Sequence, residues 1–231
     1  MQTSNLTIPD IIDDLTKDEH LTWEDHCNKV ANKIARNTGI MNRLKKTIPT
    51  SSMRILYNSF IFPHLSYGIE AWGSTAQKNL KRIKTIQKKS IRCISRSHWL
   101  AHTEPRMKKF KLLKFDDQYQ FQCLTLTYSM LKGYSPDVYD LKINQNASAQ
   151  HSLRSSTNRP ADLRPSPIGV PCNGLSFYTN ALNLWNTLPT DVQNLSNRSL
   201  FKRNLKSKFL SQYVDHVNCL NPKCTDHHYH N

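Results

Sequence analysis

Glycine is scarce in this sequence, with six residues among 231, well below the usual share of about 7%. The scarcity disfavours a turn-rich β architecture, and neither G-x-G-x-x-G nor G-x-x-x-x-G-K-[ST] occurs. A glycine-lined phosphate loop is therefore excluded. No apolar run approaches the roughly 20 residues that cross a bilayer, and the amino terminus lacks a signal-peptide pattern. We expect an intracellular protein, nuclear or cytoplasmic, that is not secreted, has no membrane partner and keeps its six cysteines reduced.

Acidic residues are absent from the segment between Lys78 and Arg96, which carries eight basic ones. The whole chain has a formal net charge of +15, and this charge is unevenly spread. Residues 20–114 hold 20 basic and four acidic residues, whereas residues 1–19 hold one lysine and five acids. A localised excess of this kind indicates a binding face, because a uniform excess would imply only solubility or general stickiness.

The basic segment has the period of an amphipathic helix. At 100° per residue, Leu80, Ile83, Ile86, Ile91, Cys93 and Ile94 share one arc. The basic residues fill the other arc: Lys78, Lys81, Arg82, Lys84, Lys88, Lys89, Arg92 and Arg96. Such a stripe suits a polyphosphate, because each phosphate contact releases condensed counterions. Three alternatives are a solvated surface face, an acidic protein partner and a membrane surface.

The remaining chain also has mainly helical periodicity, so the predicted fold class is mainly α. A helix is expected from Thr22, as N-cap, to about residue 37, with an interruption at Gly39 before the apolar spacing resumes. Further helices are expected over 50–60, 64–72, 105–132, 176–189 and 199–214. Residues 134–174, rich in Asn, Ser and Pro, predict a loop. The predicted division is an acidic lead (1–19), a basic helical domain (20–133), an irregular connector (134–175), C-terminal helices (176–214) and a Cys/His tail (215–231).

An ordered series of short motifs resembles one known family. It runs through Leu21-Thr22-Trp23, Leu56-Tyr57-Asn58-Ser59, Pro63-His64-Leu65, Trp72-Gly73, Gln87-Lys88-Lys89, His102-Thr103, Trp185-Asn186 and Phe201-Lys202. No single motif is specific, but their order and spacing over about 190 residues resemble the region after the polymerase palm in LINE-type, jockey- and CR1-like non-LTR retrotransposon reverse transcriptases.

The resemblance implies a thumb, a helical element that grips the template–primer duplex, followed by the segment after it. It implies an RNA-directed DNA polymerase whose palm and endonuclease lie outside this sequence, so the chain by itself should not polymerise. A palm supplied upstream or in trans is the enzymatic alternative. The nucleic-acid partner could be RNA, DNA or a hybrid duplex. The basic stripe would contact phosphates, with Arg43, Lys45 and Lys46 as helpers.

Carboxylates for the two divalent ions of nucleotidyl transfer are not expected here. Asp13-Asp14 and Asp116-Asp117 lack the F/Y-x-D-D spacing of a palm turn and are interpreted as capping or solvated groups.

The tail offers the clearest potential metal ligands: Cys219, Cys224, His227 and His230. Thiols and imidazoles suit Zn²⁺, but the spacing misses the common zinc patterns. The tail is therefore either a zinc site, which could serve a protein-interaction module, or a terminus with incidental ligands. Otherwise no cofactor is expected. Cys27, Cys93 and Cys123 are predicted to be small core residues. Trp23, Trp72 and Trp185 are expected to be core anchors, and burial is favoured over base stacking for Tyr57, Tyr67 and Trp99.

Overall fold

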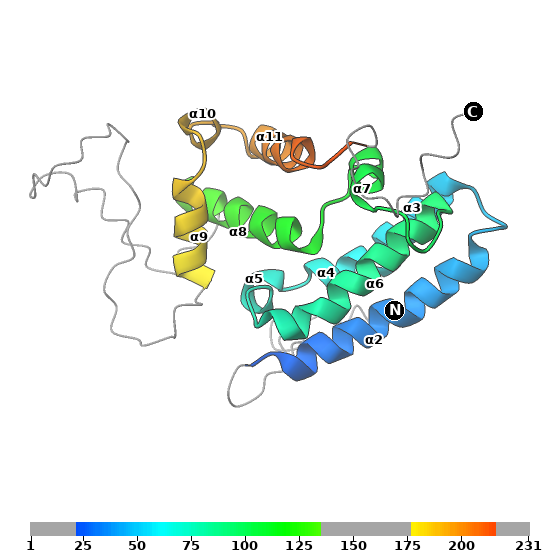
Figure 1. Cartoon of the computed structure of the whole chain (residues 1–231). Helices are drawn as coiled ribbons and strands as arrows, with labels where there is room; N and C mark the ends of the chain where they lie inside the picture. Colours follow the sequence, from blue (N-terminus) through cyan, green and yellow to red (C-terminus); the bar gives the residue numbers. More distant parts are fainter. Residues whose placement is uncertain (1–21, 135–176, 216–231) are drawn as a thin grey trace, which may run out of the picture. The chain divides into compact units, whose positions relative to one another are not determined.

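The computed structural model describes residues 22–134 and 177–215, and these contain helices joined by turns, with no strand (Figure 1). The predicted mainly α fold is confirmed. The helices are α2 (Glu24–Leu44), α3 (Thr50–Phe60), α4 (Phe62–Ser66), α5 (Ile69–Trp72), α6 (Gln77–Ser95), α7 (Glu104–Phe110), α8 (Phe115–Leu131), α9 (Phe177–Asn186), α10 (Thr190–Gln193) and α11 (Arg198–Ser211). Within the described ranges, no helix combines the length and apolarity needed to cross a membrane.

The described residues divide into two compact units. Unit 1 holds residues 22–118 and 209–215, and unit 2 holds residues 119–134 and 177–208. The acidic lead, nearly all of the predicted connector and the Cys/His tail lie outside the described residues. The five-part division drawn from the sequence stays a prediction.

Helix α2 is longer than its sequence pattern predicts. It runs without a break through Gly39, which is exposed, and a Cβ added there would meet nothing within 4 Å. A mid-helix glycine costs only about 1 kcal/mol, and the helix beyond it buries Met41. The predicted interruption is therefore wrong. The N-cap is Trp23, with φ 60°, rather than Thr22.

Gly68 causes a second departure from the predicted helices. One helix was expected over 64–72, but α4 ends at Ser66 and α5 begins at Ile69. Gly68 lies between them with φ 56°, a left-handed conformation that glycine adopts without a Cβ penalty. The turn lets Trp72 return into the core, where its indole is fully buried and its Nε1 donates to the Tyr67 carbonyl at 2.9 Å.

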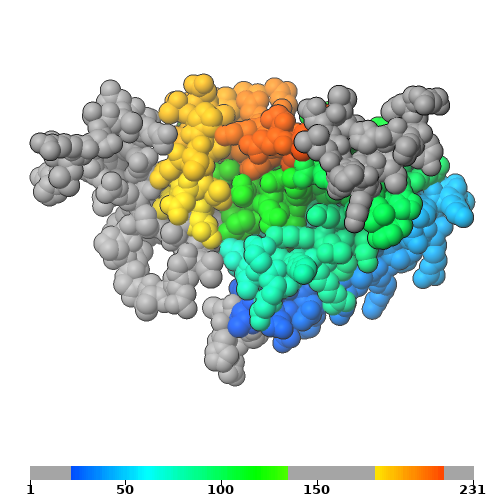
Figure 2. Space-filling view, in the orientation of Figure 1, coloured from blue at the N-terminus to red at the C-terminus, as the bar shows by residue number. Residues whose placement is uncertain are grey.

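Helices α2 and α6 form the framework of unit 1 and lie side by side in parallel (Figure 1). Polar contacts between them join residues of increasing number on both helices, as expected for parallel neighbours. Arg82 Nη2 donates to Asn32 Oδ1 at 2.7 Å, and further along the Ser90 and Thr38 hydroxyls lie 2.7 Å apart. Since parallel neighbours need a returning connection, α3, α4 and α5 run back along them. In the space-filling view the blue surface of α2 adjoins the turquoise surface of the following helices (Figure 2).

The core of unit 1 combines aliphatic side chains of α2 and α6 with aromatic side chains of other helices. The rings of Trp72 and Phe115 pack at a tilt with centroids 5.4 Å apart, and both are almost completely buried. Leu80, Ile83, Ile91 and Ile94 of α6 have at most 1% exposure. Cys27 and Cys93 are buried free thiols, which confirms their predicted role in the core, and burial raises the pKa of Cys27 to about 11.

Gln87 is a buried polar junction inside unit 1, with 4% exposure. Its Nε2 donates to the Leu113 carbonyl at 3.0 Å and to the Tyr57 hydroxyl at 3.2 Å. Its Oε1 accepts from the Phe115 amide at 3.0 Å. One side chain of α6 thereby satisfies backbone groups at the start of α8, which would otherwise be buried without partners.

Unit 2 has an aromatic centre of its own. Tyr128 of α8 stacks on Phe201 of α11 at 4.3 Å, and Trp185 of α9 lies 6.0 Å from Phe201. The Tyr128 hydroxyl donates to the Leu195 carbonyl at 2.8 Å. The Asn197 side chain caps the first turn of α11 by accepting from the Ser199 amide at 2.8 Å. Trp185 is buried as predicted, and so is Cys123.

Replacing Gln87 by Met should destabilise unit 1 while nearly preserving the side-chain volume. The Phe115 amide and the Leu113 carbonyl would lose their partner in a buried environment, which costs about 2–3 kcal/mol in free energy of unfolding. Urea denaturation followed by circular dichroism measures this loss.

Gln77→Met is the matched control, because Gln77 lies on the same helix but is exposed. It should change the free energy of unfolding by less than about 0.5 kcal/mol. Equal stability of the two variants would show that the Gln87 junction contributes nothing.

Candidate nucleic-acid interface

Helix α6 separates its apolar and basic side chains by burial. Its buried positions are Leu80, Ile83, Ile86, Gln87, Ser90, Ile91, Cys93 and Ile94. Six of the eight predicted contact residues are exposed and two are half-buried: Lys78, Lys81, Arg82, Lys88, Lys89 and Arg96 are exposed, and Lys84 and Arg92 are half-buried. The side chains thus follow the helical period as expected, since the helix docks with one face and leaves the other outside.

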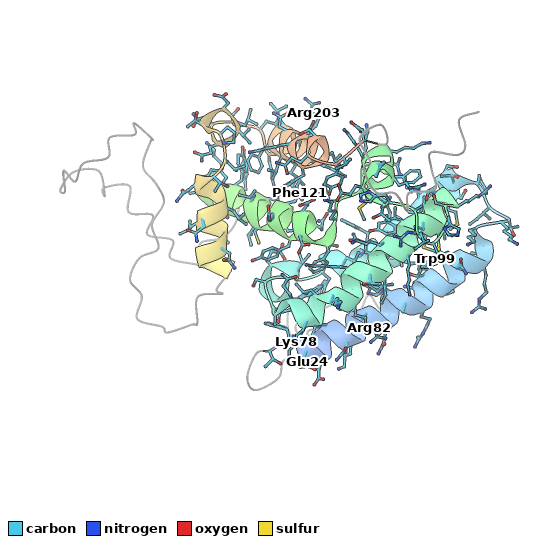
Figure 3. The ribbon with its side chains drawn as sticks, viewed as in Figure 1. Glu24, Lys78, Arg82, Trp99, Phe121 and Arg203 are labelled. Carbon is cyan, nitrogen blue, oxygen red and sulfur yellow. The ribbon has the colours of Figure 1, made fainter. Side chains whose placement is uncertain are left out.

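The basic face is less free of acids than its sequence suggests. Although α6 contains no acidic residue, Lys84 Nζ lies 2.7 Å from Asp116 Oδ1 at the start of α8. Lys78 Nζ lies 3.6 Å from Glu24 Oε2 at the start of α2. Figure 3 shows Glu24 and Lys78 close together at these helix ends. The Lys78 pair is exposed and contributes little stability, whereas Lys84 is tied more closely to its partner.

The two arginines of α6, and Arg96 at its C-cap, are each held by a neighbouring segment. Arg82 donates to Asn32, as described above, and Arg96 Nη2 donates to the Ile48 carbonyl at 2.6 Å. Arg92 Nε donates to the Ala101 carbonyl at 2.8 Å. These neutral acceptors fix the guanidinium groups without cancelling their charge, so each remains able to attract an anion.

Three lysines of α6 have no assigned partner within the described ranges. Lys81, Lys88 and Lys89 are exposed, and their ammonium groups make neither an ion pair nor a hydrogen bond there. An uncommitted ammonium group exchanges only water when it binds a phosphate, whereas a paired one must also give up its protein partner. These three are therefore the strongest phosphate-binding candidates on the helix.

A shallow groove of about 500 Å³ runs between α2 and α6, and we call it the α2–α6 groove. Its uncharged lining residues are Ala35, Thr85 and Ile86. Four basic side chains line it: Lys78, Lys81, Arg82 and Lys89. Figure 3 shows Lys78 and Arg82 on the N-terminal half of α6. The groove concentrates cations along a rigid surface, as sequence-independent phosphate contacts require.

The predicted helper residues lie at the far end of α2. Arg43 is in its last turn and exposed, Lys45 is its half-buried C-cap, and Lys46 follows in the turn. Burial raises the pKa of the Cys93 thiol and the charge of Lys45 opposes that rise, which places Lys45 beside the end of α6. The helpers therefore extend the basic surface but do not line the α2–α6 groove.

No group of three or more potential metal ligands occurs among the described residues. Asp116 pairs with Lys84, and Asp117 accepts a hydrogen bond from the Tyr213 hydroxyl. Burial raises the pKa of Asp117, which suits a hydrogen-bonded packing role better than a metal ligand. Asp13-Asp14 and the predicted zinc ligands Cys219, Cys224, His227 and His230 lie outside the described residues.

Sequence reasoning missed the placement of two aromatic residues, Trp99 and Tyr67. Burial was expected for Tyr57, Tyr67 and Trp99, and only Tyr57 is buried, with 1% exposure. Tyr67 is 38% exposed and Trp99 is 71% exposed. The available signal was local: Trp99 follows the end of the helical period at Arg96, where no spacing argument supports burial.

Two curated proteins match part of the chain. The RNA-directed DNA polymerase from mobile element jockey of Drosophila melanogaster is 28% identical over 110 residues, which cover 46% of this chain. The probable RNA-directed DNA polymerase from transposon X-element of the same organism is 25% identical over 105 residues, or 44% of this chain. The matched stretch is about 12% of the length of either relative.

No family model matches the chain, and no solved structure matches it significantly. The two polymerase matches agree with the resemblance drawn from the ordered motifs. This chain is a relative of the LINE-type RNA-directed DNA polymerases of these mobile elements.

Proposed function

We propose that this chain binds nucleic acid through the basic face of α6, in the manner of a polymerase thumb that grips template and primer. The observation that carries the proposal is the set of uncommitted lysines on the outer face of α6, of which Lys81 and Lys89 line the α2–α6 groove. Lys81, Lys88 and Lys89 face outward from a helix whose other side is buried. Their positions on one helix are fixed by the packing of that helix.

The chemistry of the basic face favours phosphates over base edges. Lysine ammonium groups act as point charges, and the guanidinium groups of Arg82, Arg92 and Arg96 already donate to protein acceptors. Phosphate contacts of this kind position a duplex without reading its sequence. A polymerase needs such contacts because its template changes at every step.

The relatives support a role for this binding in RNA-directed DNA synthesis. Both are polymerases by name, and their substrates are nucleic acids. We assign a binding role to these residues, and the carboxylates that catalyse nucleotidyl transfer would come from a palm as the protein partner. RNA, DNA and hybrid duplexes all present the phosphates that this face would contact.

Substituting Lys81, Lys88 and Lys89 together by Gln should lower duplex affinity at least about ten-fold at low salt. The slope of log K against log salt should become shallower by about 0.9 for each B-DNA phosphate that the variant no longer neutralises. Fluorescence anisotropy with a labelled blunt duplex, repeated across a salt series, measures both quantities.

The matched control removes three exposed basic residues from unit 2, by substituting Lys132, Arg198 and Arg203 with Gln. It lowers the net charge equally, so general electrostatic attraction falls by the same amount. The control should retain the wild-type salt slope. If both triple variants behave alike, binding depends on net charge and the assignment to α6 is wrong.

Thr85→Glu tests the α2–α6 groove by placing a carboxylate among its cations. Thr85 is exposed and lines the groove, and a glutamate there lies four residues from both Lys81 and Lys89. These i,i+4 pairs support the helix by a few tenths of a kcal/mol, so the fold should be retained. Duplex affinity should fall roughly three- to ten-fold, since cations that now face the carboxylate release fewer counterions from the duplex.

Thr85→Gln is its neutral control, with the same length and no charge. It should bind the duplex like the wild type in the same titration. Equal affinities for Thr85→Glu and Thr85→Gln, with unchanged thermal melting, would mean that the duplex does not enter this groove.

A further inference from the structure

A second hollow lies on the other flank of α6, and we call it the α6–α7 pocket. It measures about 240 Å³ and is formed entirely within unit 1. Lys84, Lys88 and Arg92 of α6 line one side. Leu100 belongs to the turn after α6, while Glu104 and Lys114 lie at the start of α7 and just before α8.

The charges around the α6–α7 pocket leave two cations unbalanced. Lys84 pairs with Asp116 at 2.7 Å, and Lys114 pairs with Glu104 at 2.7 Å. Within the ranges that the structure describes, neither Lys88 nor Arg92 contacts a carboxylate. An anion is therefore the group that would complete the pocket.

Arg92 is the cation most in need of such a partner. Its side chain is half-buried, and its Nε is already committed to the Ala101 carbonyl. Burial, followed by the nearby charge of Arg106, lowers the pKa of Arg92. Its surroundings therefore oppose the positive charge that it carries, and a bound phosphate would relieve that opposition.

The turn after α6 holds a solvent-exposed indole beside this pocket. Trp99 directly precedes Leu100, a pocket residue, and its 71% exposure exceeds that of every other large hydrophobic side chain described. Figure 3 shows Trp99 toward the end of α6 opposite Lys78. Exposing an indole forgoes the stabilisation of burying a large aromatic side chain, and it leaves the ring available to a ligand.

The exposure of Trp99 does not arise from a frayed turn. Arg106 Nε donates to the Ser97 hydroxyl on one side of Trp99, and Arg92 Nε donates to the Ala101 carbonyl on the other. The Ala101 amide also donates to the His98 carbonyl at 3.1 Å, and Ala101 is completely buried. The backbone around Trp99 is thus anchored on both sides while the indole stays outside.

We infer that the α6–α7 pocket and Trp99 form a binding site for an unpaired nucleotide of a nucleic-acid strand. The base stacks on the exposed Trp99 indole, and the backbone phosphate binds Lys88 and Arg92. An exposed aromatic ring beside a basic groove is the combination that recognises single strands, because every base has a face that can stack. A base paired within a duplex is already stacked on its neighbours, so the site selects unpaired nucleotides.

This inference deepens the proposed function, because it rests on nucleic acid being the ligand. It assigns different parts of the strand to the two flanks of α6. The α2–α6 groove would hold paired backbone, and the α6–α7 pocket would hold a nucleotide beyond the paired region.

Tryptophan fluorescence of the full chain, titrated with a short oligothymidylate, tests the site. Trp72 and Trp185 are buried and Trp23 is half-buried, so a base that stacks on Trp99 should quench the exposed contribution. Trp99→Leu should abolish the quenching and lower affinity for the oligothymidylate about ten-fold, since stacking contributes about 1–3 kcal/mol per base. Trp99→Phe should retain part of that affinity.

The controls separate this site from general binding. Phe60→Leu removes another exposed aromatic side chain of unit 1 and should leave oligothymidylate binding unchanged. Trp99→Leu should bind a blunt duplex like the wild type, whereas Lys88→Gln should weaken oligothymidylate binding.

Each outcome decides one of the two assignments. The inference is overturned if Trp99→Leu binds oligothymidylate as the wild type does, or if it loses duplex and single-strand affinity equally. If the wild type fails to bind duplex but oligothymidylate still quenches Trp99, the proposed duplex binding is wrong and the nucleotide site is supported.

Discussion

The burial of one face of α6 fixes the direction of every cation on that helix. Leu80, Ile83 and Ile94 have at most 1% exposure, and each such side chain contributes about 1.5–3 kcal/mol by leaving water. The surface ion pair between Lys78 and Glu24 contributes at most about 1 kcal/mol. Apolar packing therefore sets the rotation of α6, and the charges occupy whatever positions that rotation leaves outside.

Polar contacts inside unit 1 then fix the alignment of α6 along its neighbours, which apolar packing alone would leave open. Ser90 and Thr38 meet between α6 and α2, and Gln87 joins α3, α6 and the start of α8. A shift of α6 by one residue would leave these buried groups without partners, at about 1–3 kcal/mol for each. Directional bonds therefore add what non-directional hydrophobic packing lacks, a single alignment of the basic residues with α2.

That alignment gives the two flanks of α6 different characters. Toward α2, four cations line an open groove together with Ala35, Thr85 and Ile86. Toward α7, two of the four cations are already paired with Asp116 and Glu104, and an exposed indole lies next to the hollow. We propose that a long polyanion binds the first surface and a single nucleotide the second, so that one amphipathic helix would contact a strand in two ways.

The sequence by itself determined the mainly α fold, the basic face of α6 and the relationship to LINE-type polymerases, because helical period, charge runs and motif order can all be read along the chain. It also predicted the buried positions of Trp72, Trp185 and the three helix cysteines, which follow the same period. It missed the helix through Gly39 and the break at Gly68. At Gly39 the packing of the helix on either side outweighs the low helix propensity of glycine, which is about 1 kcal/mol. At Gly68 the chain uses the freedom of glycine to turn.

Only the tertiary structure decided which cations are neutralised and where Trp99 lies. Asp116 is 32 residues from Lys84, and Glu24 is 54 residues from Lys78, so no periodicity within α6 could reveal either pair. The exposure of Trp99 depends on anchors at Ser97 and Ala101 that donors on α6 and α7 provide. Local sequence sets which face of a helix is charged, whereas the packing of distant segments sets which of those charges remain available.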